Sequence, residues 1–340
     1  MSDLTRQERE ILNILQKEFP LVERPFAQVA ERVGISEADL LAKIARWRES
    51  GLLRRLGPVF DSKRIGYKSL LVAVAVPEEE LAETTAVINA YPGVTHNYLR
   101  ETLDGWPLRY NLWFTMTGAT SSEVEENLNG IKEKTGNSDL LPLPAHRLYK
   151  IKVQFFLGAE RGALREEGGY RPPKREARPV ELSPADWRLI EAFQNELEPV
   201  PEPFAPVAAS CDLSPAELLE QIKTLLAKGV IRRFGATLKH YAVGYGSNAM
   251  GVWAVPAERE EEVGKIMASF KAVSHCYART TYPQWPYNLY TMLHAGSMEE
   301  LKEIAAEISQ ATGITDYHLL HTVKEFKKIR MVYRAPRRMP

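Results

Sequence analysis

The chain is poor in cysteine and lacks any long apolar run. Cys211 and Cys276 are its only cysteines among 340 residues, too few for a disulfide framework or a cysteine-based zinc site. No apolar segment approaches the roughly 20 residues that a membrane-spanning helix requires. The charged start, MSDLTRQERE, has no apolar signal-peptide core. A protein of the reducing cytoplasm, without a membrane partner, is therefore expected.

The sequence also lacks an excess of either charge. Its 44 Lys and Arg residues match 44 Asp and Glu residues, so no net field attracts nucleic acid. With 44% hydrophobic residues, a chain of this length is expected to form about two to four domains, each with its own core.

The most informative feature present is an internal repeat. GLLRRLGPVFDSKRIGY returns as GVIRRFGATLKHYAVGY, GVTHNYLR returns as AVSHCYAR, and WPLRYNLWFTM returns as WPYNLYTM. The stretches 51–67, 93–100 and 106–116 thus recur, in the same order, at 229–245, 272–279 and 285–292. We interpret the chain as a tandem duplication. Because polar letters such as His, Tyr and Arg recur as well as apolar ones, packing alone does not explain the repeat.

The first part of each copy has the pattern of a helix-turn-helix followed by a wing strand. Ser36 is placed to cap the second helix of the turn, and Gly51 to end it. In the second copy Ser214 takes the cap position and Pro215 the first helical position, where its missing N–H costs nothing.

The second part of each copy alternates strands and helices in the βαββαβ order of a ferredoxin-like domain. The string LPLPAHRLYKIKV near the end of copy one has no evident counterpart in copy two. The expected strands cover 69–77, 94–99, 110–117 and 149–156, then 249–255, 273–278, 288–293 and 328–333.

The predicted fold class is therefore α+β, a tandem duplication of a winged helix-turn-helix plus a ferredoxin-like unit. The Gly-, Pro- and charge-rich stretch between the copies is typical of an exposed linker. The predicted boundaries are 1–65 and 183–243 for the helix-turn-helix domains, 66–157 and 244–335 for the ferredoxin-like domains, and 158–182 for the linker.

A His-x-Tyr-x-Arg string is the strongest candidate for chemistry. His96, Tyr98 and Arg100 alternate along one expected strand, so their side chains point to the same face. The second copy repeats the string as His275, Tyr277 and Arg279. Such groups cost free energy on a sheet face unless they are paired, so their repetition favours a functional reason.

Further aromatic and cationic residues cluster around these strings in the sequence. Two arginine pairs lie where each helix-turn-helix meets its sheet, and His240 follows the second pair. An aromatic slot ringed by cations suits a large flat ligand with many carboxylates. The additional candidate binding residues are Arg54, Arg55, Trp106, Tyr110, Asn111, Arg147, Lys150, Arg232, Arg233, His240, Trp285, Tyr287 and Asn288.

A helix-turn-helix joined to a ferredoxin-like sheet resembles the Lrp/AsnC family of transcription regulators, which bind DNA through the second helix of the turn. The charge pattern disfavours this function. Residues 1–65 carry an excess of only two positive charges, and 183–240 an excess of two negative charges. The second helix of the turn begins with Glu37 and Asp39 in copy one and with Glu217 and Glu220 in copy two, which would repel the phosphates that they face. A regulator or haem sensor stays the alternative interpretation, and specific DNA binding is not expected.

The paired strings resemble siroheme decarboxylase more specifically, over nearly the whole chain apart from the linker. That family is built on the Lrp/AsnC fold, and this chain resembles its fused form. The resemblance implies removal of the C12 and C18 acetate carboxyls of siroheme, giving 12,18-didecarboxysiroheme and carbon dioxide. It associates the fused form with heme d1 biosynthesis and the paired form with an alternative route to heme. It implies no cofactor beyond the iron tetrapyrrole substrate, and a pseudo-dimer within one chain, with further homodimerisation left open.

The resemblance also suggests roles. His96 and His275 would act as proton donors or as axial ligands of the siroheme iron, and the sequence does not separate these roles. Arg100 and Arg279 would hold carboxylates. Tyr98, Tyr110, Tyr277 and Tyr287 would donate to carboxylates or relay protons, while Trp106 and Trp285 would wall the pocket. Whether one or both copies hold a competent site is left open.

Overall fold

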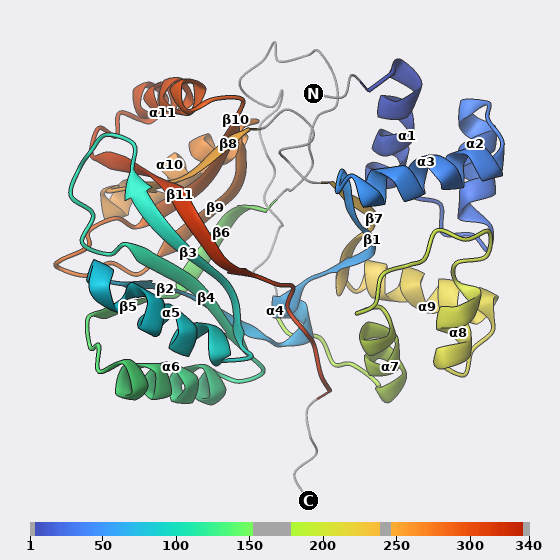
Figure 1. Cartoon of the computed structure of the whole chain (residues 1–340), viewed down its shortest axis with the longest axis horizontal. Coiled ribbons are helices and arrows are strands. Elements are labelled where there is room, and N and C mark those ends of the chain that lie inside the picture. The colour runs from blue at the N-terminus through green and yellow to red at the C-terminus, as the bar shows by residue number, and fades with distance from the viewer. Residues whose placement is uncertain (1–3, 152–177, 239–245, 336–340) are drawn as a thin grey trace, which may run out of the picture.

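The computed structural model describes residues 4–151, 178–238 and 246–335, which form two lobes. One lobe holds the helix-turn-helix units of both copies, and the other holds both ferredoxin-like units (Figure 1). The repeat therefore pairs like with like, so that each lobe is built from both halves of the chain. None of the helices within the described residues is long and apolar enough to cross a lipid bilayer.

The helix-turn-helix lobe has one hydrophobic core shared by the two copies. Phe26 and Leu12 of the first unit pack in the same cluster as Leu189 and Phe204 of the second. Ser36 and Ser214 cap their helices as the sequence predicts. The helices are α1 (Arg6–Lys17), α2 (Pro25–Val33) and α3 (Glu37–Glu49) in copy one, and α7 (Pro184–Ala192), α8 (Ala205–Ser210) and α9 (Pro215–Ala227) in copy two.

The wing strands of the two copies pair with each other. Strand β1 (Leu53–Phe60) runs antiparallel to β7 (Ile231–Leu238), and Gly57 lies opposite Gly235 at the centre. We call this two-stranded sheet the ribbon. A short helix, α4 (Ser62–Ile65), follows β1 and leads toward the sheet lobe.

Each ferredoxin-like unit has its expected strand order, β5-β2-β4-β3 in copy one and β11-β8-β10-β9 in copy two. Short 3-10 turns precede the first helix of each unit, at Glu78–Glu80 and Ala257–Arg259. Copy one comprises β2 (Lys68–Val74), α5 (Leu81–Ala90), β3 (Val94–Thr102), β4 (Leu112–Gly118), α6 (Ser121–Thr135), β5 (Leu140–Leu143) and β6 (Ala145–Ile151). Copy two comprises β8 (Ser247–Trp253), α10 (Glu260–Ser269), β9 (Val273–Arg279), β10 (Leu289–Ala295), α11 (Met298–Thr312) and β11 (Tyr317–Lys328).

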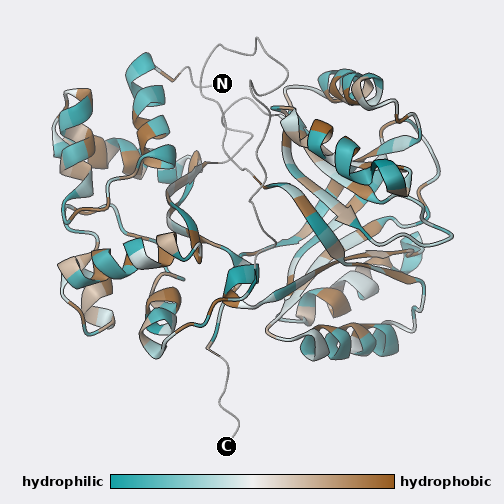
Figure 2. Cartoon of the chain, turned by 180° about the vertical axis from the view of Figure 1, so that it is seen from behind, coloured by the Kyte–Doolittle hydropathy of each residue, from teal (hydrophilic) through white to brown (hydrophobic). Residues whose placement is uncertain are grey.

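The two units exchange edge strands. Strand β11 pairs with β8 of its own unit and then with β3 of copy one, while β6 leaves copy one to pair with β9 of copy two. Helices α5 and α6 cover one outer face, α10 and α11 the other (Figure 1). Brown strands inside and teal outer helix faces follow this layering in Figure 2. The nine strands of this lobe pair into one continuous sheet, in the order β5-β2-β4-β3-β11-β8-β10-β9-β6. Its copy-one and copy-two halves, called the two sheets below, enclose a core that includes Trp113, Trp285 and Tyr290.

The end of copy two differs from the sequence prediction. The closing strand is Tyr317–Lys328, so the strand predicted at 328–333 is wrong. Copy two also has a counterpart of the string that it was expected to lack. In copy one, Pro144 separates β5 from β6, because proline has no N–H for a ladder. Copy two has no proline between Tyr317 and Lys328, so the single strand β11 corresponds to both β5 and β6 of copy one. The predicted strand at 149–156 begins earlier, at Ala145, and its part beyond Ile151 lies outside the described residues.

The predicted tandem α+β fold is confirmed. The linker predicted at 158–182 lies mostly outside the described residues, and His240 lies outside them too.

Candidate active site

The three chemical side chains of copy one lie in a row on β3, as their spacing predicts. The His96 and Tyr98 ring centroids are 6.0 Å apart, and the Arg100 guanidinium lies 5.2 Å from the centre of the Tyr98 ring. The intervening Asn97 is buried on the opposite, helix-covered face, where it donates to Asn89 of α5. The row therefore faces the other sheet.

Copy two repeats the row on β9. The ring centroids of His275 and Tyr277 are 6.2 Å apart, and the Arg279 guanidinium lies 5.1 Å from the Tyr277 ring centre. Cys276, between them, is fully buried in the helix-covered core. Burial raises the pKa of Tyr277, so this phenol keeps its proton and can donate a hydrogen bond at neutral pH.

A hydroxyl group orients each imidazole. Thr95 Oγ1 lies 2.9 Å from His96 Nδ1, and Ser274 Oγ lies 2.9 Å from His275 Nδ1. Within the described residues, the Nε2 atom of neither ring has a hydrogen-bond partner. Each histidine thus presents Nε2 for a ligand. These hydroxyls were not among the predicted site residues, although a Thr or Ser precedes the histidine in both copies.

Both histidines are held in their neutral form. Burial, with the positive charges of Lys328 and Arg54, lowers the pKa of His96 to about 4, although Glu325 acts in the opposite direction. Burial, then Arg232, His96 and Arg279, lower the pKa of His275 to about 4. The pKa shift of each histidine thus includes the effect of an arginine of the ribbon, Arg54 for His96 and Arg232 for His275.

The ribbon divides its arginine pairs between two faces. Arg54 and Arg232 act on the histidines and so face the sheet lobe. Arg55 donates instead to the Phe193 carbonyl, at 2.8 Å, and Arg233 to the Gln16 carbonyl, at 3.3 Å. Arg55 of copy one is thereby hydrogen-bonded to the helical part of copy two, and Arg233 of copy two to the helical part of copy one. These contacts show a structural use for Arg55 and Arg233, whereas the predicted binding role remains a prediction.

The two row arginines connect the sheets. Arg100 Nη1 donates to the Leu320 carbonyl at 3.0 Å, and Arg279 Nη1 donates to the Leu143 carbonyl at 2.6 Å. The Nε atom of each has no hydrogen-bond partner among the described residues. Burial lowers the pKa of Arg100 to about 10, which leaves its guanidinium charged at neutral pH, and burial also lowers the pKa of Arg279.

The predicted aromatic residues gather between the sheets, away from the histidine end of the rows. Trp285 is 1% exposed and donates to the Tyr290 hydroxyl at 2.7 Å. Its ring lies 5.7 Å from that of Tyr110 and 4.9 Å from that of Tyr287. Trp106 stacks on His318, with ring centroids 4.2 Å apart. Within the described residues these rings pack against one another as core.

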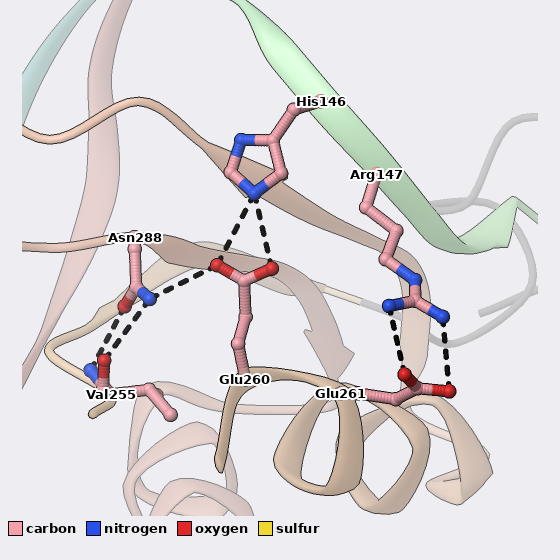
Figure 3. Close-up of polar contacts among 6 residues, drawn as sticks. All are labelled: His146, Arg147, Val255, Glu260, Glu261 and Asn288. Atoms are coloured by element: carbon pink, nitrogen blue, oxygen red, sulfur yellow. Dashed lines mark hydrogen bonds and ion pairs between the residues drawn. The ribbon is translucent and has the colours of Figure 1, made fainter. Parts of the chain in front are cut away.

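The two predicted asparagines, Asn111 and Asn288, form hydrogen bonds with backbone groups. Asn288 Oδ1 accepts from the Val255 N–H at 2.9 Å, and its Nδ2 donates to the Val255 carbonyl at 3.1 Å (Figure 3). Asn111 makes the same two bonds with Val76, at 3.0 and 2.8 Å. Each asparagine therefore fixes the end of a neighbouring strand.

The predicted cations of β6 are also engaged. Arg147 forms a surface ion pair with Glu261 of α10, beside the contact of His146 with Glu260 (Figure 3). Lys150 is 1% exposed and donates to the Phe270 carbonyl at 2.8 Å. Both side chains attach β6 to the α10 layer.

Strand register adds residues that the sequence analysis did not assign. Lys328 lies opposite His96, and Glu325 lies opposite Tyr98. The corresponding positions beside His275 and Tyr277 are held by Ile151 and Leu148. Aligning the two closing segments, YKI with FKK, would have exposed this difference. No group of three or more His, Cys, Asp or Glu side chains suited to a metal ion occurs in 4–151, 178–238 or 246–335.

Family models cover both parts of each copy. The model described as an AsnC-like ligand binding domain matches residues 64–150 and 242–327. The model described as the siroheme decarboxylase NirDL-like HTH domain matches residues 8–54 and 186–232. The matched pairs confirm the duplication.

Individual proteins extend the match to nearly the full chain. A siroheme decarboxylase of Hydrogenobacter thermophilus is 39% identical over 95% of this chain and 94% of its own length. A crystal structure of the siroheme decarboxylase NirDL with an iron-uroporphyrin III analogue superposes with a TM-score of 0.72 at 35% identity, covering 96% of this chain and 94% of that one. The siroheme decarboxylase beta subunit of Methanosarcina barkeri is 44% identical over 43% of this chain and 97% of its own length, so one copy here corresponds to a whole subunit there. The chain therefore belongs to the siroheme decarboxylase family, in its fused two-copy form.

Proposed function

We propose that this protein removes the C12 and C18 acetate carboxyls of siroheme, giving 12,18-didecarboxysiroheme and carbon dioxide in the cytoplasmic biosynthesis of heme d1. The observation that carries the proposal is the pair of imidazoles at equivalent positions of the two copies, each oriented through Nδ1 and presenting Nε2. The related NirDL structure in complex with an iron-uroporphyrin III analogue supports a tetrapyrrole ligand.

The reaction needs little beyond positioning and a proton. As the bond between the methylene and carboxyl carbons breaks, carbon dioxide leaves and its bonding electrons stay on the methylene carbon. The conjugated macrocycle takes up that charge, so the substrate serves as its own electron sink and no further cofactor is required. A proton then converts the methylene group into a methyl group.

In this proposal His96 and His275 act through Nε2, as proton donors or as axial ligands of the substrate iron. With pKa values of about 4, both are neutral at neutral pH, which suits iron ligation directly. Proton donation requires substrate carboxylates to raise the histidine pKa first, because a nearby negative charge favours the protonated imidazole. Arg54 would bind carboxylates from the ribbon. The Nε atoms of Arg100 and Arg279, which have no hydrogen-bond partner in the described part of the chain, would hold them at the far end of each row.

The deciding experiment is anaerobic incubation of the purified protein with siroheme, followed by mass spectrometry of the extracted tetrapyrrole. We expect loss of two molecules of carbon dioxide per siroheme. Tetrapyrrole that is bound but unchanged would refute the enzyme proposal and favour a sensor. Loss of heme d1, with protoheme retained, after gene deletion in the host would test the pathway.

Spectroscopy separates the two histidine roles. An axial imidazole changes the absorption and electron paramagnetic resonance spectra of bound siroheme, whereas a proton donor does not. If His275→Ala shifts the bound spectrum and His96→Ala does not, His275 is the ligand and His96 the donor. The reverse pattern exchanges these assignments, and two unshifted spectra exclude ligation by either histidine.

A further inference from the structure

The strands that flank the two histidines are structurally equivalent but chemically different. In an antiparallel pair, residues directly opposite each other project to the same face. Lys328 and Glu325 of β11 therefore stand beside His96 and Tyr98, whereas Ile151 and Leu148 of β6 take these places in copy two. One histidine thus has a cation and a carboxylate as neighbours, and the other has two aliphatic side chains.

The ribbon adds to this difference. Arg54 is exposed and forms no ion pair with another described residue. Its counterpart Arg232 is bound by Asp61, with 2.9 Å between Nε and Oδ2. Asp61 is itself fixed, because its other oxygen accepts the N–H groups of Lys63 and Arg64. Asp61 therefore balances the charge of Arg232 within the protein, whereas Arg54 is available to a ligand.

Lys328 can also take a ligand carboxylate. Its ion pair with Glu325 is long, at 3.3 Å, and the Glu325 side chain is 47% exposed, so this pair is weak. An ammonium group has three donors and can bind a second carboxylate. Lys328 and Arg54 both lower the pKa of His96, which places both charges near its ring.

We propose that Lys328, together with Arg54, forms a carboxylate-binding subsite beside His96, and that Leu148 and Ile151 form an apolar wall beside His275. A polycarboxylate macrocycle meeting these two surfaces binds in one orientation, because a carboxylate against the apolar wall would lose its hydration without a partner. Although the fold is nearly two-fold symmetric, the ligand is not bound symmetrically. This inference rests on the proposed tetrapyrrole substrate and adds Lys328 as a determinant of its orientation.

The test compares Lys328→Met with a matched variant, Lys324→Met. Lys324 lies on the same strand, but its ammonium group sits over the Phe326 ring, 5.0 Å from the centre. Anaerobic absorbance titration with siroheme gives the Kd. We expect Lys328→Met to weaken binding about tenfold or more, as for loss of a charge-assisted hydrogen bond, and to reduce the salt dependence. Lys328→Arg should keep wild-type affinity, which also controls for misfolding.

A charge relocation tests the orientation itself. The double variant Lys328→Ile with Ile151→Lys moves the cation from the His96 side to the His275 side. We expect affinity to recover relative to Lys328→Met, and the singly decarboxylated intermediate to change to the other isomer. Equal Kd values for Lys328→Met and Lys324→Met, or an unchanged intermediate in the relocated variant, would overturn the inference. The Kd comparison measures binding alone. It therefore tests the inference even if siroheme binds without losing carbon dioxide, which is the result that would refute the proposed function.

Discussion

The two copies have the same side-chain contacts where they build the sheet, and they differ in the residues that lie opposite the two histidines. Asn111 and Asn288 each form the same two hydrogen bonds with a valine backbone, and Arg100 and Arg279 each donate to a carbonyl of the other copy. These bonds satisfy polar groups that are costly to bury unpaired. Loss of either partner should therefore lower the free energy of unfolding in the same way in both copies.

The residues opposite the histidines carry no such constraint. Lys328 lies opposite His96, and Ile151 lies opposite His275, at equivalent register positions. Among the described residues, no side-chain hydrogen bond is common to these two positions. Duplication therefore supplies a symmetric frame, and the lining within it is free to become asymmetric. An asymmetric ligand needs such a frame, because a strictly two-fold site would accept it in two orientations.

The largest expected effect comes from removing either imidazole. His96→Ala and His275→Ala should each lower the rate of siroheme decarboxylation at least about 100-fold, as expected for loss of a group that transfers a proton. Anaerobic initial rates would measure this, with His146→Gln, at the α10 surface, as the control. Loss of only one decarboxylation in each variant would show instead that each half serves one acetate. Near-wild-type rates in both variants would contradict the assignment.

The pH dependence of stability should reveal the buried, neutral histidines. Their ordinary pKa of about 6.5 applies in the unfolded chain, and their native values are about 4. Between these values the unfolded chain binds more protons than the native protein. The free energy of unfolding should therefore fall as the pH is lowered from about 6.5 to about 4, by at most about 1.4 kcal/mol per pH unit for each histidine.

Urea denaturation at a series of pH values gives this slope. Other groups contribute equally to wild type and variant, so the difference between them isolates one histidine. His96→Gln and His275→Gln should each flatten the slope in this window. Parallel curves would show that the imidazoles are not held neutral.

A smaller effect is expected in the helix-covered cores, where the copies also differ. A Cβ at Gly264 of α10 would lie 2.4 to 2.6 Å from atoms of the buried Tyr149 ring, so Gly264→Ala should lower the free energy of unfolding by about 1 to 3 kcal/mol. Helix α5 carries Thr85 at the corresponding position, and its hydroxyl has no hydrogen-bond partner within the described residues. Thr85→Ala should therefore cost less in the same denaturation assay, and equal losses would contradict this packing difference.

Much of the architecture could be predicted because it depends on local signals. Serine caps, glycine stops and period-two alternation predicted the helices of both turns and the shared face of His96, Tyr98 and Arg100. The closing strand of copy two was misplaced for a physical reason. Strand pairing between the copies extends Tyr317–Lys328 as one element, and this stabilisation comes from a distant segment that local patterns do not reveal.

The sequence by itself determined that one unit occurs twice, that each unit holds a row of imidazole, phenol and guanidinium groups, and that a large polyanionic ligand would suit them. Only the tertiary structure decided which candidates face that ligand. It bound Arg55 to the Phe193 carbonyl and left its neighbour Arg54 exposed, with its charge acting on His96. It also placed Lys328 beside a histidine more than two hundred residues away in the chain, because edge strands pair by spatial proximity and hydrogen bonding, which sequence order does not encode.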